Sequence, residues 1–152
     1  MTTGRANPYA NFAMIQPLTD FANAAQHGLD PTIVELIKIR ASQINGCAMC
    51  LHMHTRNAIA QGETPARIFL LDAWQESPFF TDAERAVLAW TEALTNIVET
   101  RAPDAAYEAL QAHFKPEQQL QITLLVGAIN AYNRLNVAFR IRHPRGAAMQ
   151  AA

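Results

Sequence analysis

The residues best suited to chemistry lie together in segment 47–54, which reads CAMCLHMH. Cys47 and Cys50 are the only two cysteines in the chain, and His54 follows Cys50 by four positions. Because neighbours at i, i+3 and i+4 share one face of a helix, the three side chains are expected to form a continuous stripe. Two thiols beside a base can form a redox site, and the same atoms could also hold a metal ion.

The sequence offers each thiol a different means of activation. A cysteine attacks as the thiolate, and the start of a helix lowers the pKa of a thiol placed there, which favours Cys47. A histidine one turn along can take the proton of Cys50 and stabilise the resulting charge. One cysteine could therefore attack and become a sulfenic acid, and the other could condense with it to form a disulfide.

Helix signals run along the whole chain, and strand signals are nearly absent. Asp30-Pro31 and Thr64-Pro65 each combine an N-cap with a proline at the first helical position, and Thr81 to Glu84 match a capping box. These patterns predict an all-α fold in a single domain over residues 1–152, a compact bundle of about six to seven helices. The predicted ranges are 8–27, 31–44, 47–61, 65–75, 82–97, 103–113 and 116–140.

Asn45-Gly46 is expected to form the turn that positions the site. Either residue tolerates the left-handed conformation that ends a helix, so one helix should stop there and the next begin at Cys47. If the chain reverses at this turn, a rise of about 1.5 Å per residue brings Glu35 and His54 within about 3 Å of the same height. Glu35 could then orient His54 or relay its proton.

The last predicted helix, 116–140, has no clean polar face across its middle, which is typical of a helix central to a core or to an assembly. Asn130, Asn133, Arg134 and Asn136 cluster in its second half. Buried amides need partners, so these residues either bond across an interface or cap neighbouring helices. His52 has no partner on the predicted stripe and is expected to be exposed.

Composition narrows the class of protein. Only 16% of the residues are charged and the formal net charge is −1, so no basic cluster favours nucleic acid or an anionic membrane. The first twelve residues do not resemble a secretory signal, and the most apolar stretch, 122–131, is about half as long as a membrane span. We therefore expect a cytoplasmic protein, with part of its apolar surface covered by partner subunits.

Glu35, Cys47, Cys50 and His54 resemble the signature of the alkylhydroperoxidase D (AhpD) family, within the carboxymuconolactone decarboxylase superfamily. That signature is a glutamate, eleven residues and then Cys-x-x-Cys-x-x-x-His, and every spacing is kept here. The resemblance covers most of residues 20–142. It extends to segments similar to the family's single-domain members: Ser77 to Thr81, Glu84-Arg85, and Ile129 to Asn136.

The resemblance implies an oligomer, a trimer or hexamer, that reduces organic hydroperoxides without metal or other cofactor. Cys50 would attack the peroxide, activated by His54 through a relay that includes Glu35, and Cys47 would resolve the oxidised intermediate as a disulfide. Electrons would come from a dithiol, such as a lipoylated protein or a thioredoxin-like reductant, and a peroxiredoxin could be a further partner.

Alternatives to this interpretation stay open at the level of sequence. Two thiolates, an imidazole and a carboxylate could bind zinc, although three ligands on one helix do not readily surround a tetrahedral ion. A non-redox enzyme of the same superfamily, such as a lactone decarboxylase, would not depend on a cysteine pair. The disulfide could instead serve a binding or sensing protein as a switch, and the cysteines could also be plain core residues.

Overall fold

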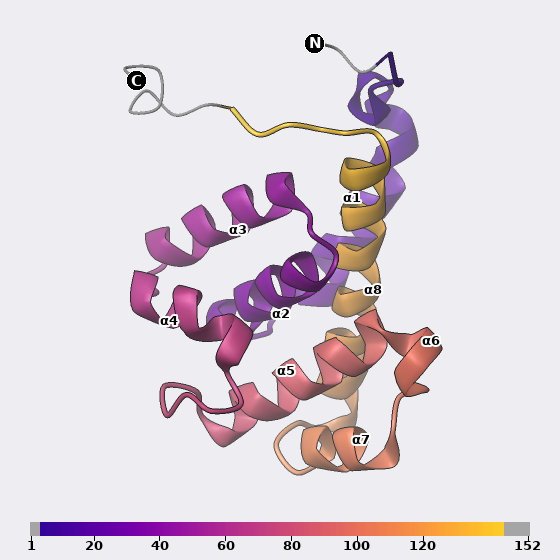
Figure 1. Ribbon diagram of the computed structural model, residues 1–152. Coiled ribbons are helices and arrows are strands. Elements are labelled where there is room, and N and C mark those ends of the chain that lie inside the picture. The colour runs from indigo at the N-terminus through magenta and orange to yellow at the C-terminus, as the bar shows by residue number, and fades with distance from the viewer. Residues whose placement is uncertain (1–3, 145–152) are drawn as a thin grey trace.

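The long helix α8 (Pro116–Ala138) runs through the molecule, and helices α1, α2 and α5 pack along it (Figure 1). The computed structural model describes residues 4–144, which contain helices, turns and no strand. The predicted all-α fold is confirmed. The remaining elements are η1 (Pro8–Ala10), α1 (Phe12–Gln26), α2 (Pro31–Ile44), α3 (Ala48–Ala60), α4 (Pro65–Leu70), η2 (Leu71–Ala73), α5 (Asp82–Thr95), α6 (Ile97–Thr100) and α7 (Asp104–Gln111).

The helices begin where their caps predicted. The Asp30 carboxylate accepts hydrogen bonds from the backbone N–H groups of Thr32 and Ile33 at the start of α2. At the start of α5, Thr81 and Glu84 form the expected reciprocal capping box. Such caps satisfy the backbone donors that a helix leaves free at its first turn.

Apart from shifts of one or two residues at helix ends, the elements differ from the prediction in three places. The range 8–27 is divided at Asn11, whose non-helical backbone separates the short η1 from α1. The range 65–75 stays α-helical to Leu70 and then tightens into the 3₁₀ turn η2. The four-residue helix α6 was not predicted, because a single turn has too few residues to show an apolar period; it ends at Arg101, which has a left-handed backbone.

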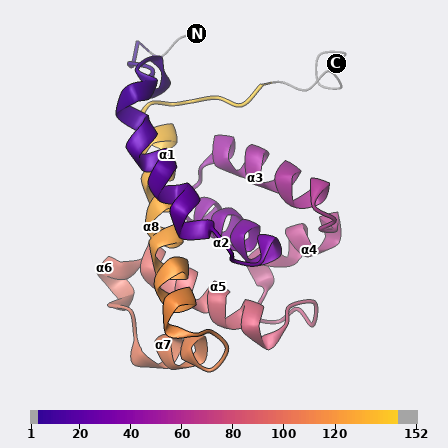
Figure 2. The same cartoon turned by 180° about the vertical axis from the view of Figure 1, so that it is seen from behind.

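The core has two parts that share helices α2 and α5. One part joins these helices to α8, and the other joins them to α3 and α4. Figure 2 shows α1 lying across α8 on the opposite side from that of Figure 1. The fully buried side chains at the centre of the first part include Ile37, Val87, Ile122, Leu125 and Val126. The central position expected for the last helix is therefore observed.

The loop before α5 is held by arginines. Arg85 donates hydrogen bonds to the carbonyl oxygens of Gln75, Ser77 and Phe80, and Arg67 pairs with Glu84. The family-like segment from Ser77 to Arg85 therefore has a structural role in fixing this loop. Among residues 4–144, no helix is long and apolar enough to cross a membrane.

Candidate active site

The turn between α2 and α3 places Cys47 at a helix start. The N–H of Cys47 donates to the carbonyl of Ser42 (2.9 Å) and the N–H of Gly46 donates to that of Gln43 (3.1 Å), the two bonds of a Schellman motif. Gly46 has φ of 65°, the left-handed conformation that this motif requires. The chain reverses here, and Cys47 becomes the N-cap of α3.

Cys47 and Cys50 are joined as a disulfide, and both are buried, each 1% exposed. The sulfur of Cys47 accepts a hydrogen bond from the backbone N–H of Cys50 (3.3 Å), as a capping side chain does. The structure therefore shows the pair in its two-electron oxidised form. Spacing by one helical turn is what allows this bond to close without moving the helix.

Glu35 and His54 meet as the hairpin predicted. Nδ1 of His54 lies 2.9 Å from Oε2 of Glu35, and both side chains are buried. When Glu35 is a carboxylate it can only accept, so Nδ1 carries the proton and Nε2 keeps the lone pair. This arrangement prepares Nε2 as a base. Without the spacing of the family signature, Glu35 would have been predicted to lie on the surface, because acidic residues near a helix start are common.

Lys38 is a further charged residue at the site, which sequence reasoning missed. Its ammonium donates a hydrogen bond to Oε1 of Gln26 (2.6 Å) and lies 3.6 Å from Oε1 of Glu35. Burial lowers the pKa of Lys38, and the neighbouring Glu35 carboxylate partly opposes that change. A lysine three residues after a glutamate is so common on helix surfaces that its position gave no signal.

Two residues distant in sequence complete the surroundings of Cys50. Nδ2 of Asn136, on α8, donates to the sulfur of Cys50 (3.2 Å), and Oδ1 of Asn136 accepts from the hydroxyl of Tyr9 (2.8 Å). Tyr9 therefore orients the amide, since its O–H leaves the NH₂ group facing the sulfur. Burial raises the pKa of Tyr9, so its hydroxyl keeps its proton well into the alkaline range.

The other asparagine side chains of α8, Asn130 and Asn133, bond to the turn that ends α2 and not to the sulfur of Cys50. Nδ2 of Asn45 donates to Oδ1 of Asn130 (3.0 Å) and of Asn133 (2.9 Å), while Nδ2 of Asn133 donates to the Ser42 hydroxyl (2.9 Å). These bonds tie the end of α2 to α8 within one chain. They favour the alternative that the amides cap a neighbouring helix.

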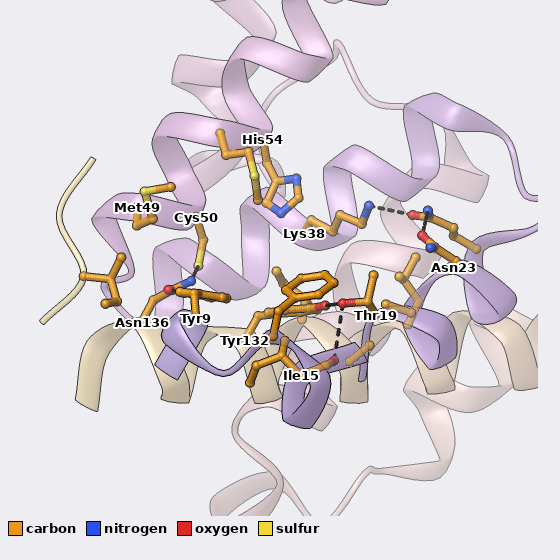
Figure 3. A pocket seen from close by; sticks show the side chains of 18 residues that line it. Tyr9, Ile15, Thr19, Asn23, Lys38, Met49, Cys50, His54, Tyr132 and Asn136 are labelled. Carbon is orange, nitrogen blue, oxygen red and sulfur yellow. Dashed lines mark hydrogen bonds between the residues drawn. The ribbon is translucent and has the colours of Figure 1, made fainter. Parts of the chain in front are cut away.

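A cavity of about 550 Å³ opens beside Cys50 and His54 (Figure 3). Helices α1, α2, α3 and α8 form its walls, and most of its lining is apolar. Polar groups lie near Cys50 on one side and near Lys38 and Asn23 on the other. The hydrogen-bonded hydroxyls of Thr19 and Tyr132 lie between them. The apolar side chains that line it include Phe12, Ile15, Met49, Met53, Leu125 and Ile129.

Cys47 lines a different, smaller hollow of about 390 Å³. Met49, Asn136 and Ile141 line both hollows, and Arg140 and Arg142 line only the smaller one. Cys50 therefore lines the larger hollow, and Cys47 lines the smaller, adjoining one. This division was not predicted, because it depends on where α8 and the segment after it cross the start of α3.

The expectation for His52 is wrong. His52, expected to be exposed, is half-buried, and its ring stacks on that of His143 with centroids 4.6 Å apart. The reason is the segment after α8, which returns across α3 and supplies the stacking partner (Figure 1). Within the described part of the chain, no group of three or more His, Cys, Asp or Glu side chains is arranged to hold a metal ion.

Comparison with known families gives one family match. The model of the carboxymuconolactone decarboxylase family matches residues 13–93. The uncharacterised protein YdfG of Bacillus subtilis (strain 168) is 42% identical over 113 residues, which are 74% of this chain and 77% of YdfG. The uncharacterised protein YnjA of Escherichia coli (strain K12) is 25% identical over 130 residues, 86% of this chain and 71% of YnjA.

Solved structures show the same fold. A protein of unknown function from Agrobacterium tumefaciens, provisionally described as the antioxidant defence protein AhpD, superposes with a TM-score of 0.90 at 43% identity; the match covers 93% of this chain and 99% of that one. The debrominase Bmp8 superposes with a TM-score of 0.74 over 91% of this chain and 73% of its own. At 21% identity, Bmp8 shares the fold alone.

Proposed function

The chain belongs to the carboxymuconolactone decarboxylase family, and on that basis we propose that it is a thiol-dependent peroxidase of the alkylhydroperoxidase D type. The observation that carries the proposal is the Cys47–Cys50 disulfide, with Cys50 at the wall of an apolar cavity. His54 lines the same cavity, and Glu35 is hydrogen-bonded to it. Its substrates are organic hydroperoxides, because an apolar cavity favours an apolar carbon skeleton.

The first step is attack by Cys50. Nε2 of His54 takes the thiol proton, helped by Glu35 at Nδ1, and the N–H of Asn136 stabilises the thiolate. The sulfur attacks the terminal oxygen of the hydroperoxide, and the O–O bond breaks. Cys50 becomes a sulfenic acid, and the alkoxide leaving group receives a proton from His54 to leave as the alcohol.

The second step is resolution by Cys47. Its thiol, at the N-cap of α3, is favoured as a thiolate by the helix N-terminus. It attacks the sulfur of Cys50, an S–S bond forms, and the S–O bond breaks to release water with the proton of Cys47. The product is the disulfide present in the structure.

A dithiol reductant closes the cycle. It returns two electrons and two protons to the pair and becomes a disulfide itself, so that the net reaction converts a hydroperoxide and a dithiol into an alcohol, water and a disulfide. A lipoylated protein or a thioredoxin-like protein supplies this chemistry, and a cytoplasmic location keeps such donors reduced.

We further propose a trimer or hexamer, since Met14, Phe69 and Val98 are large apolar residues left exposed on this chain.

The experiment that tests the proposal is a thiol count on the metal-free, reduced protein before and after one equivalent of cumene hydroperoxide, with intact mass measured in parallel. Loss of both thiols within seconds, with the mass lower by two protons and cumyl alcohol formed, is the expected result. Thiols that persist would overturn the peroxidase function and leave a non-redox enzyme or a metal-binding protein. Rapid oxidation without turnover by any dithiol would identify a disulfide switch instead.

A further inference from the structure

The cavity beside Cys50 is amphipathic along its length. Its inner part is formed by Cys50 and His54, which are buried, and its outer part by Asn23, which is exposed, and by the half-buried Gln26 and Lys38 (Figure 3). Between them the lining consists mostly of apolar side chains of α1 and α8, together with the hydroxyls of Thr19 and Tyr132, which are hydrogen-bonded to each other. A ligand that fills it must therefore be apolar over most of its length and polar at the end that reaches the rim.

The polar end of that ligand must suit a half-buried cation. The ammonium of Lys38 has three N–H donors, and among residues 4–144 it makes one hydrogen bond, to Gln26, with the Glu35 carboxylate at 3.6 Å. Glu35 is engaged by His54 at 2.9 Å through its other oxygen. Lys38 is therefore only partly neutralised at the cavity wall.

A neutral apolar ligand would displace water from this ammonium without providing a hydrogen-bond acceptor. Desolvation of a charged group without such a partner is unfavourable. A carboxylate would accept a charge-assisted hydrogen bond from it, stronger than the bond that Gln26 now accepts. The amide groups of Gln26 and Asn23, themselves joined at 3.2 Å, stand at the same rim and can donate further N–H groups.

We propose that the preferred substrate is the hydroperoxide of a long-chain carboxylic acid, of the fatty-acid class, whose carboxylate binds Lys38 at the rim while its mid-chain peroxide reaches Cys50. This inference rests on the proposed peroxidase function. It assigns Lys38 as the residue that determines specificity. A volume of about 550 Å³ is in the range of cavities that bind molecules of this size.

The test compares a hydroperoxide of linoleic acid with its methyl ester, below their micellar concentrations. The full-length reduced protein is mixed with each in single turnover, and the rate of thiol loss is measured. The ester keeps the peroxide and the chain and removes only the charge. The free acid is expected to react about tenfold faster or more, the factor that a charge-assisted hydrogen bond supplies.

Lys38→Met is expected to bring the ratio of acid to ester rates close to one. The ratio is the readout because any general loss caused by disturbing Glu35 lowers both rates. Arg56→Met is the matched control: it removes one positive charge from an exposed position on α3, outside the cavity, and should keep the ratio of the unchanged protein. Lys38→Arg retains the cation and should keep most of the preference.

The outcomes separate the two proposals. Equal rates for acid and ester, or a preference that survives Lys38→Met, would overturn the substrate class and leave the peroxidase function standing. No thiol loss with either compound would also overturn the substrate class, and no thiol loss with cumene hydroperoxide as well would overturn the peroxidase function itself. If Lys38→Met does not fold, the affinities of linoleic acid and methyl linoleate for the unchanged disulfide form are measured by calorimetry instead. The proposal requires that the acid binds about tenfold more tightly than the ester.

Discussion

The two sides of the disulfide differ in what they offer the sulfur that faces them. Cys50 borders a large, mostly apolar cavity and receives a side-chain N–H from Asn136, whereas Cys47 borders a smaller hollow with Arg140 and Arg142 and caps a helix. A hydroperoxide with a carbon skeleton suits the first space. If a dithiol reductant reaches the pair from the second hollow, it attacks Cys47, and Cys50 is the leaving group.

One disulfide is thus bordered by two different hollows, one at each cysteine. Two cysteines one turn apart on an isolated helix would share one environment, and the crossing of α8 over the start of α3 separates their environments here.

The test with the largest expected effect replaces each cysteine in turn with serine. Cys50→Ser is expected to abolish peroxide consumption, while Cys47→Ser should consume one equivalent and stop at the sulfenic acid, trapped by dimedone and seen by mass.

The control for that pair is the thiol titre of each variant before peroxide is added, which must be one. Equal residual turnover in both variants would contradict the division of roles. A sulfenic acid on Cys47 in the Cys50→Ser protein would reverse them.

The second test concerns the base. Glu35→Gln and His54→Gln are each expected to raise the pKa of the Cys50 thiol and to slow peroxide reduction at neutral pH about 10²-fold or more for His54, and less for Glu35. The direction follows from the proposed relay, in which His54, held by Glu35, takes the thiol proton and then favours the charged sulfur. This pKa is given by the pH dependence of alkylation by iodoacetamide. The measurement is made in Cys47→Ser variants, in which Cys50 is the only thiol that can react. An unchanged titration curve would remove both residues from the relay.

The third test weakens the donor that reaches Cys50 from α8. Asn136→Leu removes the N–H at 3.2 Å from the sulfur, and we expect alkylation and peroxide reduction to slow about tenfold. Tyr9→Phe keeps Asn136 and removes only the O–H that orients it, so its effect should be smaller, about two- to fivefold. A larger effect for Tyr9→Phe than for Asn136→Leu would mean that the hydroxyl acts on the sulfur by another route.

The fourth test leaves the chemistry in place and strains the turn. A Cβ at Gly46 would meet nothing within 4 Å, but its φ of 65° is unfavourable for other residues. Gly46→Ala should therefore lower the free energy of unfolding by about 1–2 kcal/mol, measured by urea denaturation of the disulfide form. Asn45, whose side chain the α8 amides hold, is unchanged, so activity should fall little. A loss of activity without a loss of stability would show that the turn moves during the reaction.

The local chemistry of the site was readable from the sequence. Cys47, Cys50 and His54 lie within one short segment, and Asn45-Gly46 carries its own turn signal, so helix spacing and capping rules alone bring them together. Even the approach of Glu35 to His54 follows from two helices of known rise joined by a two-residue turn. Caps at Asp30, Thr64 and Thr81 likewise fixed helix starts, because each is a contact within four residues.

Only the tertiary structure decided what faces each sulfur. Tyr9 and Asn136 are 127 positions apart, and Asn136 and Cys50 are 86 apart, so no local rule links them. Lys38 stands at the cavity because α1 and α8 enclose its side of α2, which an amphipathic pattern does not reveal. Local bonds depend on spacing along the chain, whereas cavities and long-range hydrogen bonds depend on how whole helices pack, and packing is set by all their side chains together.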